Sequence, residues 1–300
     1  MKRVLVLRLS ALGDVIHTIP AVAALQEEAT VQWVVEAPYR ELVEIVAGVE
    51  AIPVRMKQWA RSPSLIREAI RSMRAETSVD FQGLIKSAML GWLAGANERI
   101  GFDAHAIREK PALLFTNRKV HVDTTKHVIE QNLQLARGAA GFSPPNDERR
   151  AEARRSTGWD AYTGAVEKTN DILILPGAGK PNKLWSVDRW KQIAKNTNAL
   201  IAWGPNEREL AESIGGRLAP PTNLRELASL LRSAKLVIGG DTGPLHLAAA
   251  LNTRVVGLYG PTHAWRNGPH GQLDHCIQEK SMDAISVEAV MNMVERVAAE

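Results

Sequence analysis

Short apolar runs alternate with segments of helical periodicity along most of the chain. In the first half, the apolar runs predict strands and the periodic segments between them predict helices. The expected strands are residues 3–9, 31–36, 51–54 and 78–81, and the expected helices are residues 15–28, 39–47, 63–74 and 84–94. A further amphipathic run, residues 126–140, ends at Gly141, which suits a helix C-cap.

A second series of the same kind fills the other half. It predicts strands at 171–175, 199–203, 235–238 and 254–259, and helices at 187–195, 207–214, 224–232, 244–251 and 287–299, the last capped by Ser286. Between the two series, residues 146–168 are highly charged and lack a buried strand, so they mark a connection. We therefore expect an α/β protein of two doubly wound, Rossmann-like domains facing one cleft. Their expected bounds are residues 1–155 and 156–300, with the last helix, 286–300, able to pack back on the first domain.

The composition is that of a globular protein. Apolar residues make up 45% and charged residues 23% of the 300 positions, which excludes a disordered chain or a fibrous repeat. The single Cys276 excludes an internal disulfide and a site with several cysteine ligands, and it favours a reducing compartment. The apolar run at residues 4–9 is far shorter than the about 18 residues of a membrane span, and no cleavable signal pattern follows it. We expect a cytoplasmic protein.

The net charge of +4 is too small to predict a nucleic-acid partner, but it is unevenly distributed. Residues 55–126 contain 13 Lys or Arg and 7 Asp or Glu, a net charge of +6, which leaves −2 for the rest of the chain. This stretch predicts either a surface for an anionic partner or a solvated surface with a local excess of arginine. Its basic residues include Arg61, Lys86, Arg108, Lys110, Arg118, Lys119 and Lys126.

Several motifs of nucleotide and metal sites are absent from the sequence. No Gly-x-Gly-x-x-Gly follows the first strand, and the pair Gly177 and Gly179 lacks the third glycine because residue 182 is Asn. Lys180 follows Gly179 but precedes Pro181, so there is no Walker A loop. His-Glu-x-x-His, Cys-x-x-Cys and Asp-x-Asp do not occur either, which argues against a dedicated metal site.

Residues 10–15 (SALGDV) lie where the first strand turns into the first helix. Ligands of open α/β sheets bind at the carboxyl ends of the strands, so the turn at Gly13 would carry Asp14 into that crevice. A carboxylate held there suits a general base. Spacing alone favours a simpler interpretation, in which Asp14 caps the helix.

Two glycine-containing turns in the second half indicate anion binding. Residues 176–186 (PGAGKPNKLWS) offer backbone N–H groups and two lysines between a strand and a helix, which suits phosphate. An ordinary turn with solvated lysines and a core Trp185 is the alternative. Residues 239–249 (GGDTGPLHLAA) place Pro244 in the first helical turn, so that the N–H groups of Thr242 and Gly243 point outward. The alternative here is a helix cap with a packed His246. A turn at residues 259–262 (YGPT) lies on the same rim.

Taken together, these residues resemble the bacterial lipopolysaccharide heptosyltransferases, which are inverting glycosyltransferases of the GT-B fold with two Rossmann-like domains. The resemblance covers essentially the whole chain and rests on five segments whose order and separation agree. They are residues 10–20 (SALGDVIHTIP), 80–87 (DFQGLIKS), 176–185, 241–246 (DTGPLH) and 259–262. Residues 80–88 and 117–119 (NRK) look more like heptosyltransferase I, which adds the first heptose to Kdo, than like heptosyltransferase II.

The resemblance implies that the first domain binds the Kdo sugar of lipid A, at the cytoplasmic face of the inner membrane, and that the second binds ADP-heptose. Asp14 matches the base that deprotonates the acceptor hydroxyl, and Lys183 matches the lysine that neutralises the departing diphosphate. No metal or cofactor is implied, since lysine and helix N-terminal dipoles can stabilise the diphosphate. The implied donor site comprises Gly177, Ala178, Gly179, Lys183, Glu207, Thr222, Asp241, Thr242, Gly243 and His246, and the implied acceptor site comprises Gly13, Gln82, Lys86, Arg108, Arg118 and Lys119.

Two departures from the family pattern concern the donor. The loop GAGKPNKLW has fewer small hydroxylated residues than the heptosyltransferase I pattern, and residue 222 is Thr where a larger apolar residue is expected near the base. Adenine is therefore an implication of the family rather than of this pocket. The alternatives are a glycosyltransferase with another nucleotide-sugar or anionic glycan acceptor, a non-catalytic nucleotide-sugar-binding protein, and an epimerase of similar shape. An epimerase requires acid/base groups on both sides of the sugar, whereas only Asp14 is suitably placed.

Overall fold

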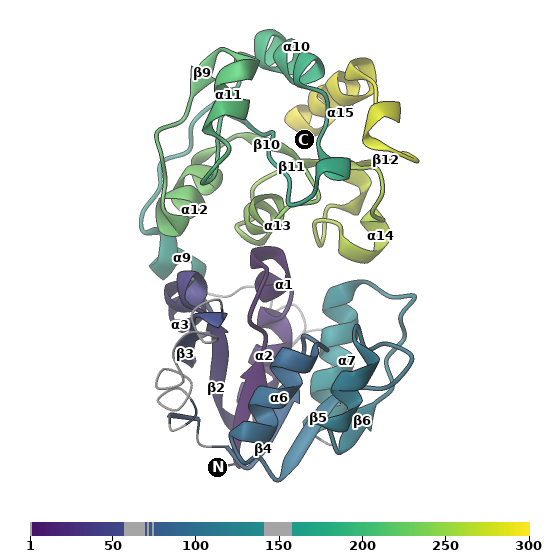
Figure 1. Ribbon diagram of the computed structural model, residues 1–300. Coiled ribbons are helices and arrows are strands. Elements are labelled where there is room, and N and C mark those ends of the chain that lie inside the picture. Colours follow the sequence, from purple (N-terminus) through teal and green to yellow (C-terminus); the bar gives the residue numbers. More distant parts are fainter. Residues whose placement is uncertain (1, 57–69, 71, 74, 141–157) are drawn as a thin grey trace. The chain divides into compact units, whose positions relative to one another are not determined.

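The computed structural model of the 300-residue chain describes all residues except 1, 57–69, 71, 74 and 141–157 (Figure 1). The chain divides into two compact units, Met1–Tyr162 and Thr163–Glu300. The sequence placed this division after residue 155. The structure places it later because α9 (Gly158–Thr163) begins on the N-terminal unit, where Gly158 lies against the backbone of Ile45 and Val46.

The described part of the N-terminal unit forms a six-stranded parallel sheet in the order β3-β2-β1-β4-β5-β6. The strands are β1 (Lys2–Leu7), β2 (Ala29–Glu36), β3 (Glu50–Val54), β4 (Thr77–Asp80), β5 (Glu98–Phe102) and β6 (Arg118–Val120). The helices are α1 (Leu12–Ile16), α2 (Ile19–Gln26), α3 (Arg40–Val46), α6 (Ile85–Leu93) and α7 (Val128–Ala140), with 3-10 turns η1 (Ala37–Tyr39) and η2 (Lys110–Leu114).

The described part of the C-terminal unit repeats this plan, with a parallel sheet in the order β9-β8-β7-β10-β11-β12. Both sheets therefore have the strand order 3-2-1-4-5-6 of the Rossmann fold. The strands are β7 (Ile172–Leu175), β8 (Leu200–Ile201), β9 (Arg217–Leu218), β10 (Leu236–Gly240), β11 (Val255–Tyr259) and β12 (Cys276–Gln278). The helices are α10 (Val187–Thr197), α11 (Arg208–Ile214), α12 (Leu224–Ser233), α13 (Gly243–Ala250), α14 (Ala264–Asn267) and α15 (Val287–Ala299), with 3-10 turns η3 (Pro181–Lys183), η4 (Leu273–His275) and η5 (Met282–Ala284).

The single helix expected at residues 15–28 is divided into α1 and α2. Pro20 lies in the first turn of α2 and has no N–H with which to continue the hydrogen-bond ladder of α1. The Thr18 hydroxyl donates instead to the Asp14 carbonyl at 2.8 Å, across the break. The division makes α1 a short element at the end of β1, and this element carries Asp14.

Four described strands were missed by the sequence prediction: β5, β6, β9 and β12. β6 and β9 are edge strands of two or three residues that are mostly exposed, so they carry no apolar run. The helix expected at residues 63–74 falls mainly outside the described residues, as does the part of the connection at 146–157 and Arg61. No helix among the residues that the structure describes is long and apolar enough to cross a membrane.

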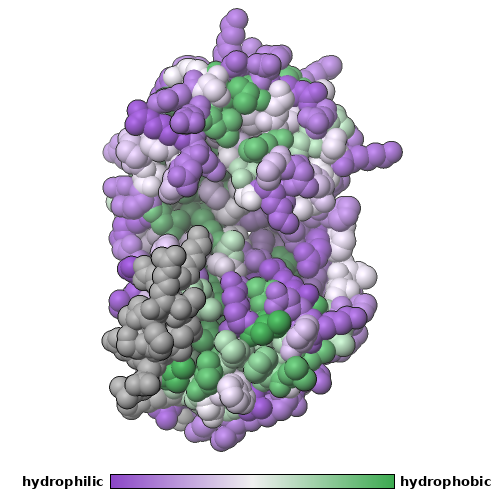
Figure 2. Space-filling model, in the orientation of Figure 1, coloured by the Kyte–Doolittle hydropathy of each residue, from purple (hydrophilic) through white to green (hydrophobic). Residues whose placement is uncertain are grey.

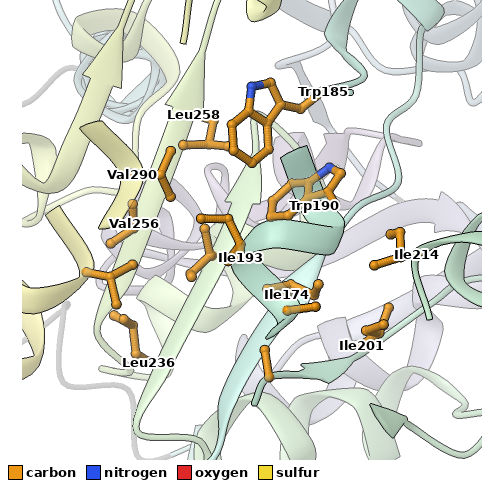
Figure 3. Packing of buried hydrophobic residues seen from close by; sticks show 14 of the residues in the cluster. Ile174, Trp185, Trp190, Ile193, Ile201, Ile214, Leu236, Val256, Leu258 and Val290 are labelled. Atoms are coloured by element: carbon orange, nitrogen blue, oxygen red, sulfur yellow. The ribbon is translucent and has the colours of Figure 1, made fainter. Parts of the chain in front are cut away.

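The helix expected to pack back on the first domain, α15, is built into the core of the C-terminal unit. Val290, Val294 and Val297 are buried there with Trp190 and Ile193 of α10, and Figure 3 shows Val290 beside these α10 residues. An apolar stripe shows that a helix face is buried but not which element covers it, and here the elements that cover it belong to the C-terminal unit. The start of α15 is as predicted, since the Ser286 hydroxyl accepts the Ala289 N–H at 3.1 Å.

Candidate active site

The topology brings the predicted segments together in pairs. The strand order of each sheet reverses at a switch point, between β1 and β4 in the N-terminal unit and between β7 and β10 in the C-terminal unit. Ligands of open α/β sheets bind at the carboxyl ends of the strands at such points. Residues 10–15 follow β1 and residues 81–84 follow β4, while the two glycine-containing turns follow β7 and β10. Each unit thus has one candidate half-site.

Asp14 forms ion pairs with two arginines in the N-terminal half-site. Its Oδ1 lies 3.1 Å from Arg8 Nη2 and 3.2 Å from Arg108 Nη2, and Arg108 also donates to Oδ2 at 3.3 Å. Asp14 lies in the first turn of α1, whose N-cap is Ala11. The interpretation that spacing alone favoured, Asp14 as the N-cap, is therefore wrong. The carboxylate faces guanidinium groups from the end of β1 and from the loop before η2.

Arg8 is the buried member of this cluster. Its side chain is 1% exposed, and its Nη1 donates to the Phe81 carbonyl at 2.6 Å, across the switch point. The Trp33 indole donates to the Arg8 carbonyl at 3.0 Å. The buried guanidinium requires Asp14 and the Phe81 carbonyl as partners because an unpaired charge in the interior is costly. Arg8 therefore holds Asp14 in place, whereas Arg108, with its side chain 44% exposed, is accessible to a ligand.

The ion pairs of Asp14 keep its carboxylate ionised and also reduce its basicity. Burial raises the pKa of Asp14, but the charges of Arg8 and Arg108 and the Arg108 hydrogen bonds outweigh it, so the pKa lies below its usual value. The carboxylate is ionised at neutral pH, as a general base must be. The same arginines weaken it, since a proton on Asp14 competes with two cations. An anionic ligand that draws Arg108 away would strengthen the base.

Two buried side chains, one at the end of β4 and one just after it, hold the switch point in place. Asp80 Oδ1 accepts the N–H groups of Gln82 at 2.9 Å and Gly83 at 3.2 Å, and Gln82 Oε1 accepts the Leu9 N–H at 2.7 Å. Burial raises the pKa of Asp80 to about 6. Gln82, predicted in the acceptor site, thus uses its amide oxygen to hold the loop after β1.

Arg118, another predicted acceptor residue, is not brought to Asp14. Its Nη1 lies 2.7 Å from Glu98 Oε1, and the same carboxylate pairs with Lys2 at 3.1 Å. Lys2 and Glu98 are the first residues of β1 and β5, so this cluster lies toward the amino ends of the strands, while Asp14 lies at the carboxyl ends. Of the remaining three predicted residues, Gly13 is buried in α1, Lys86 is half-buried on α6, and Lys119 is exposed on β6.

A lysine, a carboxylate and a histidine meet in the C-terminal half-site. Lys183 Nζ lies 2.6 Å from Asp241 Oδ2, and His246 Nε2 lies 3.1 Å from Asp241 Oδ1. The three side chains come from η3, the residue after β10, and α13, and all are largely buried. Asp241 is therefore not a simple helix cap, and His246 does more than pack. The two turns that the sequence singled out form one cluster.

Asp241 is held ionised in this cluster. Burial raises its pKa, but the hydrogen bonds and charges of His246 and Lys183 outweigh it and hold the pKa well below the usual range. An ionised carboxylate has more acceptor positions than these two donors use. The cluster thus offers an ammonium group for a phosphate beside a carboxylate oxygen for hydroxyl groups.

Trp185 anchors the loop that carries Lys183. The indole is 3% exposed, meets Trp190 edge to face at 4.9 Å, and donates from Nε1 to the Ile285 carbonyl at 3.1 Å. Figure 3 shows both tryptophans in the apolar cluster of the C-terminal unit. Trp185 is a core residue, as the simpler interpretation of this loop held. Lys183, two residues earlier, is nonetheless not solvated but bound to Asp241.

The start of α13 provides further polar groups. Thr242 is the N-cap, yet its hydroxyl makes no cap hydrogen bond. In the described part of the chain, Thr242 Oγ1 is buried without a hydrogen-bond partner. The first N–H groups of a helix also lack intrahelical partners. Thr242 and Gly243 therefore present an unused hydroxyl and a helix N-terminus beside Asp241, an arrangement that suits an anion.

The other predicted donor residues lie on neighbouring loops. A Cβ atom on Gly177 would collide with the Glu207 carboxylate, so the loops after β7 and β8 are in contact. Glu207 Oε2 also accepts the Gly204 N–H at 2.8 Å. The absence of a side chain at Gly177 leaves room for the Glu207 carboxylate in this position. In the same region, Ala178 is half-buried, Gly179 is exposed, and Thr222 is half-buried just before the N-cap of α12.

Arg8 and Asp80 were not among the predicted site residues. A charged residue directly after an apolar strand, within an apolar run, is the signal that points to Arg8. Asp80 carried no such signal beyond its place in the segment DFQGLIKS. Among the residues described by the structure, no group of three or more His, Cys, Asp or Glu side chains is arranged to hold a metal ion.

Two Rossmann-like sheets in one chain, each with its polar cluster at the switch point, are the architecture of the GT-B glycosyltransferases. Comparison with family profiles is more specific. The profile described as "Glycosyltransferase family 9 (heptosyltransferase)" matches residues 64–294. The chain belongs to this family.

Individual relatives agree with this assignment. The chain is 29% identical to lipopolysaccharide heptosyltransferase 1 of Escherichia coli strain K12 over 294 residues, which cover 90% of this chain and 91% of the relative. The solved structure of E. coli heptosyltransferase WaaC with ADP has a TM-score of 0.80 and 26% identity, covering 98% of this chain and 99% of that one. The structure of the same enzyme with ADP-2-deoxy-2-fluoro heptose has a TM-score of 0.78 and 27% identity, with the same coverage.

Proposed function

We propose that this enzyme transfers a heptose from ADP-heptose to a Kdo sugar of lipid A, with inversion at the anomeric carbon, in synthesis of the lipopolysaccharide inner core. The observation that carries the proposal is the cluster of Lys183, Asp241 and His246 beside the N-terminus of α13. It combines a cation for a diphosphate with acceptors for sugar hydroxyls. The similar structures that hold ADP and an ADP-heptose analogue support this donor, and the curated relative's name supports the lipopolysaccharide acceptor.

The C-terminal unit binds the donor in this proposal. Lys183 and the N–H groups of Thr242 and Gly243 bind the diphosphate, while Asp241 accepts hydrogen bonds from the heptose hydroxyls. His246 orients the Asp241 carboxylate through the bond to Oδ1. Glu207 lies near the ribose, against the loop of Gly177, and Thr222 and the loop residues Ala178 and Gly179 border the nucleotide.

The N-terminal unit supplies the base. Asp14 takes the proton of the Kdo hydroxyl as its oxygen attacks the anomeric carbon of the heptose from the face opposite the diphosphate. The new C–O bond forms while the bond to the phosphate oxygen breaks, and ADP leaves with that electron pair. Gly13 places Asp14 in the first turn of α1, Gln82 holds the adjoining loop, and Arg108 offers a guanidinium to the Kdo carboxylate.

Lys183 provides the charge that the leaving diphosphate requires. The developing negative charge on ADP is stabilised by a preorganised ammonium group and by helix N–H groups, which can replace a metal ion. The Lys183 Nζ is already aligned, because Asp241 and the anchored Trp185 loop hold it. We therefore propose a metal-independent transfer.

The location follows from the acceptor. Kdo-lipid A is anchored in the inner membrane, so an enzyme that modifies its sugar works in the cytoplasm and at the cytoplasmic face of that membrane. The basic residues Lys86 and Lys119 of the N-terminal unit belong to the surface that we propose for this anionic acceptor, whereas Arg118 is paired with Glu98.

The deciding experiment measures ADP release by the purified full-length chain with ADP-heptose, in the presence and absence of a Kdo-lipid A acceptor. We expect ADP only when the acceptor is present, and a product whose heptose has the inverted anomeric configuration by NMR. Equal ADP release without acceptor would indicate a hydrolase. Binding of ADP-heptose without turnover would indicate a non-catalytic module. Faster turnover with another nucleotide sugar would show that this other sugar, and not ADP-heptose, is the donor.

A further inference from the structure

α6 presents an apolar face to solvent. Ile85, Met89 and Trp92 are spaced so that they share one side of the helix, and Ile85 is 38% and Trp92 54% exposed. The opposite side packs on β1 and β4 through Ser87, Ala88, Leu90 and Gly91. The outer face of a surface helix is normally polar. This face is apolar, and Lys86 is the one charged residue of the helix.

The turn η2 enlarges this apolar surface. It packs against α6, and its Leu114 is 83% exposed. Phe115 follows η2 and meets the Trp92 ring edge to face at 6.1 Å. Among the described residues, Leu114 and Trp92 are the most exposed large apolar side chains. We define the α6–η2 patch as Ile85, Met89, Trp92, Leu114 and Phe115; apolar residues gather over the lower half of the face shown in Figure 2, where α6 lies.

Three lysines lie within or next to the α6–η2 patch along the chain. Lys86 lies at its start on α6, Lys110 is the first residue of η2, and Lys119 follows Phe115 by four positions. In the described part of the chain, these three ammonium groups take part in no observed ion pair, whereas the nearby Glu98 is paired with Arg118. Tryptophan and leucine accompanied by these lysines match the interfacial region of a bilayer that contains anionic phospholipid.

The patch adjoins the proposed base. The Glu109 N–H donates to the Gly83 carbonyl at 3.0 Å, and Glu109 Oε2 accepts the N–H of Ile85 at 2.8 Å. The preceding residue, Arg108, binds Asp14. One continuous set of contacts therefore leads from Asp14 to the first residue of the α6–η2 patch.

We propose that the α6–η2 patch docks on the surface of an anionic phospholipid bilayer, so that a lipid-anchored acceptor reaches Asp14 from that surface. The part about the acceptor rests on the proposed function, whereas the docking itself does not. The lysine charges favour a bilayer over a second copy of the chain. A symmetric dimer through this patch would bring the lysines of both copies together, and like charges across an interface are unfavourable.

The test is co-sedimentation of the full-length protein with vesicles of phosphatidylethanolamine and phosphatidylglycerol, compared with vesicles of phosphatidylcholine. We expect stronger binding to the anionic vesicles, a loss of about tenfold or more for Leu114→Ser and Trp92→Ser, and a loss of about fivefold for Lys110→Ser. Leu218→Ser and Lys195→Ser, at exposed positions of the C-terminal unit, are matched controls that should bind as the wild type does. Leu114 is almost fully exposed, so its substitution tests the patch even if Trp92→Ser destabilises the fold.

Transfer assays separate this proposal from the proposed function. Leu114→Ser should slow transfer to a vesicle-embedded acceptor while leaving transfer to a water-soluble Kdo acceptor unchanged. Wild-type binding by the patch variants, or equal binding to both vesicle types, would overturn the docking proposal. A dimer in solution that Leu114→Ser dissociates would also overturn it. Vesicle binding as expected without transfer to any acceptor would support the docking and reject the heptosyl transfer.

Discussion

Asp14 combines a fixed and an accessible ion pair. Arg8 is buried and bound to the Phe81 carbonyl, so it stays with Asp14 whether or not a substrate is present. Arg108 is half exposed, and a carboxylate of the acceptor can compete with Asp14 for it. Acceptor binding and activation of the base are then coupled through one side chain.

Asp14→Asn should lower kcat by about 10²-fold or more, because an amide cannot take the acceptor proton. The affinity for ADP-heptose should stay nearly unchanged, since the C-terminal unit holds the donor. The buried Arg8 loses its anionic partner in this variant, so the protein should also unfold at lower temperature. Steady-state kinetics give kcat, a donor titration gives the affinity for ADP-heptose, and thermal unfolding gives the change in stability. Near-normal turnover would reject Asp14 as the base.

Arg108→Gln should move the acid limb of the kcat/KM profile to higher pH. Arg108 lowers the pKa of Asp14, so its removal raises that pKa, and the base stays protonated up to a higher pH. The pH dependence of kcat/KM at saturating donor measures the shift. Arg118→Gln is the control, because Arg118 pairs with Glu98 and should leave the limb in place. An unshifted limb in Arg108→Gln would contradict the coupling.

Lys183→Ala should cost about 2–4 kcal/mol of transition-state stabilisation, as expected for a group that meets charge developing on the leaving diphosphate. Lys180→Ala, on an exposed residue of the same loop, should have little effect. Chelation with EDTA should also have little effect on the wild type. The measurement compares kcat/KM of Lys183→Ala, of Lys180→Ala and of the wild type in EDTA. Activity that is lost in EDTA and restored by Mg²⁺ or Mn²⁺ would contradict the role of Lys183.

At the scale of elements, the site depends on loops fixed by buried neighbours. The turn after β7 carries Lys183 but is anchored by Trp185, and the turn after β1 carries Asp14 but is held by Gln82. The break between α1 and α2 at Pro20 keeps Asp14 on a separate short helix. Rigid cores therefore position polar side chains that the loops alone would leave mobile.

Trp185→Phe should destabilise the protein by about 1–3 kcal/mol and raise KM for the donor, because it removes the hydrogen bond to Ile285 and part of the packing that holds the Lys183 loop. Trp190→Phe is a matched control. Its indole Nε1 has no hydrogen-bond partner in the described part of the chain, so only packing is lost. Urea unfolding and donor KM compare the two. Equal donor KM values would show that the anchor does not position Lys183.

Strands with an apolar run could be predicted from the sequence, whereas the interior strand β5 and the edge strands β6, β9 and β12 could not. β1, β7, β10 and β11 are apolar because parallel strands covered on both faces leave no polar side. The edge strand β9 has two exposed residues, and its pairing depends on β8 rather than on its own pattern. The periodicity of apolar residues therefore does not identify short edge strands.

The same division holds for the candidate site. Lys183, Asp241 and His246 could be identified because glycine-containing turns after strands have a local signature, and the resemblance to a family added their roles. The role of Arg8 could not, because it depends on contacts made across the sheet, and Asp80 bonds to the nearby Gln82 and Gly83 N–H groups without any signal that marked it in the segment DFQGLIKS. Arg8 reaches Phe81, 73 positions away, and no local pattern encodes that pairing. Long-range contacts are fixed by topology.

The whole molecule divides the reaction between two units of similar fold. The N-terminal unit carries the proposed base and most of the excess positive charge, while the C-terminal unit carries the Lys183 cluster. Two copies of one architecture thus serve an anionic acceptor and a nucleotide donor separately. Salt should therefore act on the two substrates differently.

Lys86→Ala combined with Lys119→Ala should raise KM for a water-soluble anionic acceptor and flatten its salt dependence, with donor KM unchanged. Neither lysine has an observed ion pair in the described part of the chain, so both charges are available to steer the acceptor. Screening should reduce their effect, since the Debye length falls from about 8 Å at physiological ionic strength to about 3 Å at 1 M salt. Kinetics at low and high salt, with Lys195→Ala and Lys235→Ala in the C-terminal unit as the control, test this division. An equal rise in both KM values would contradict it.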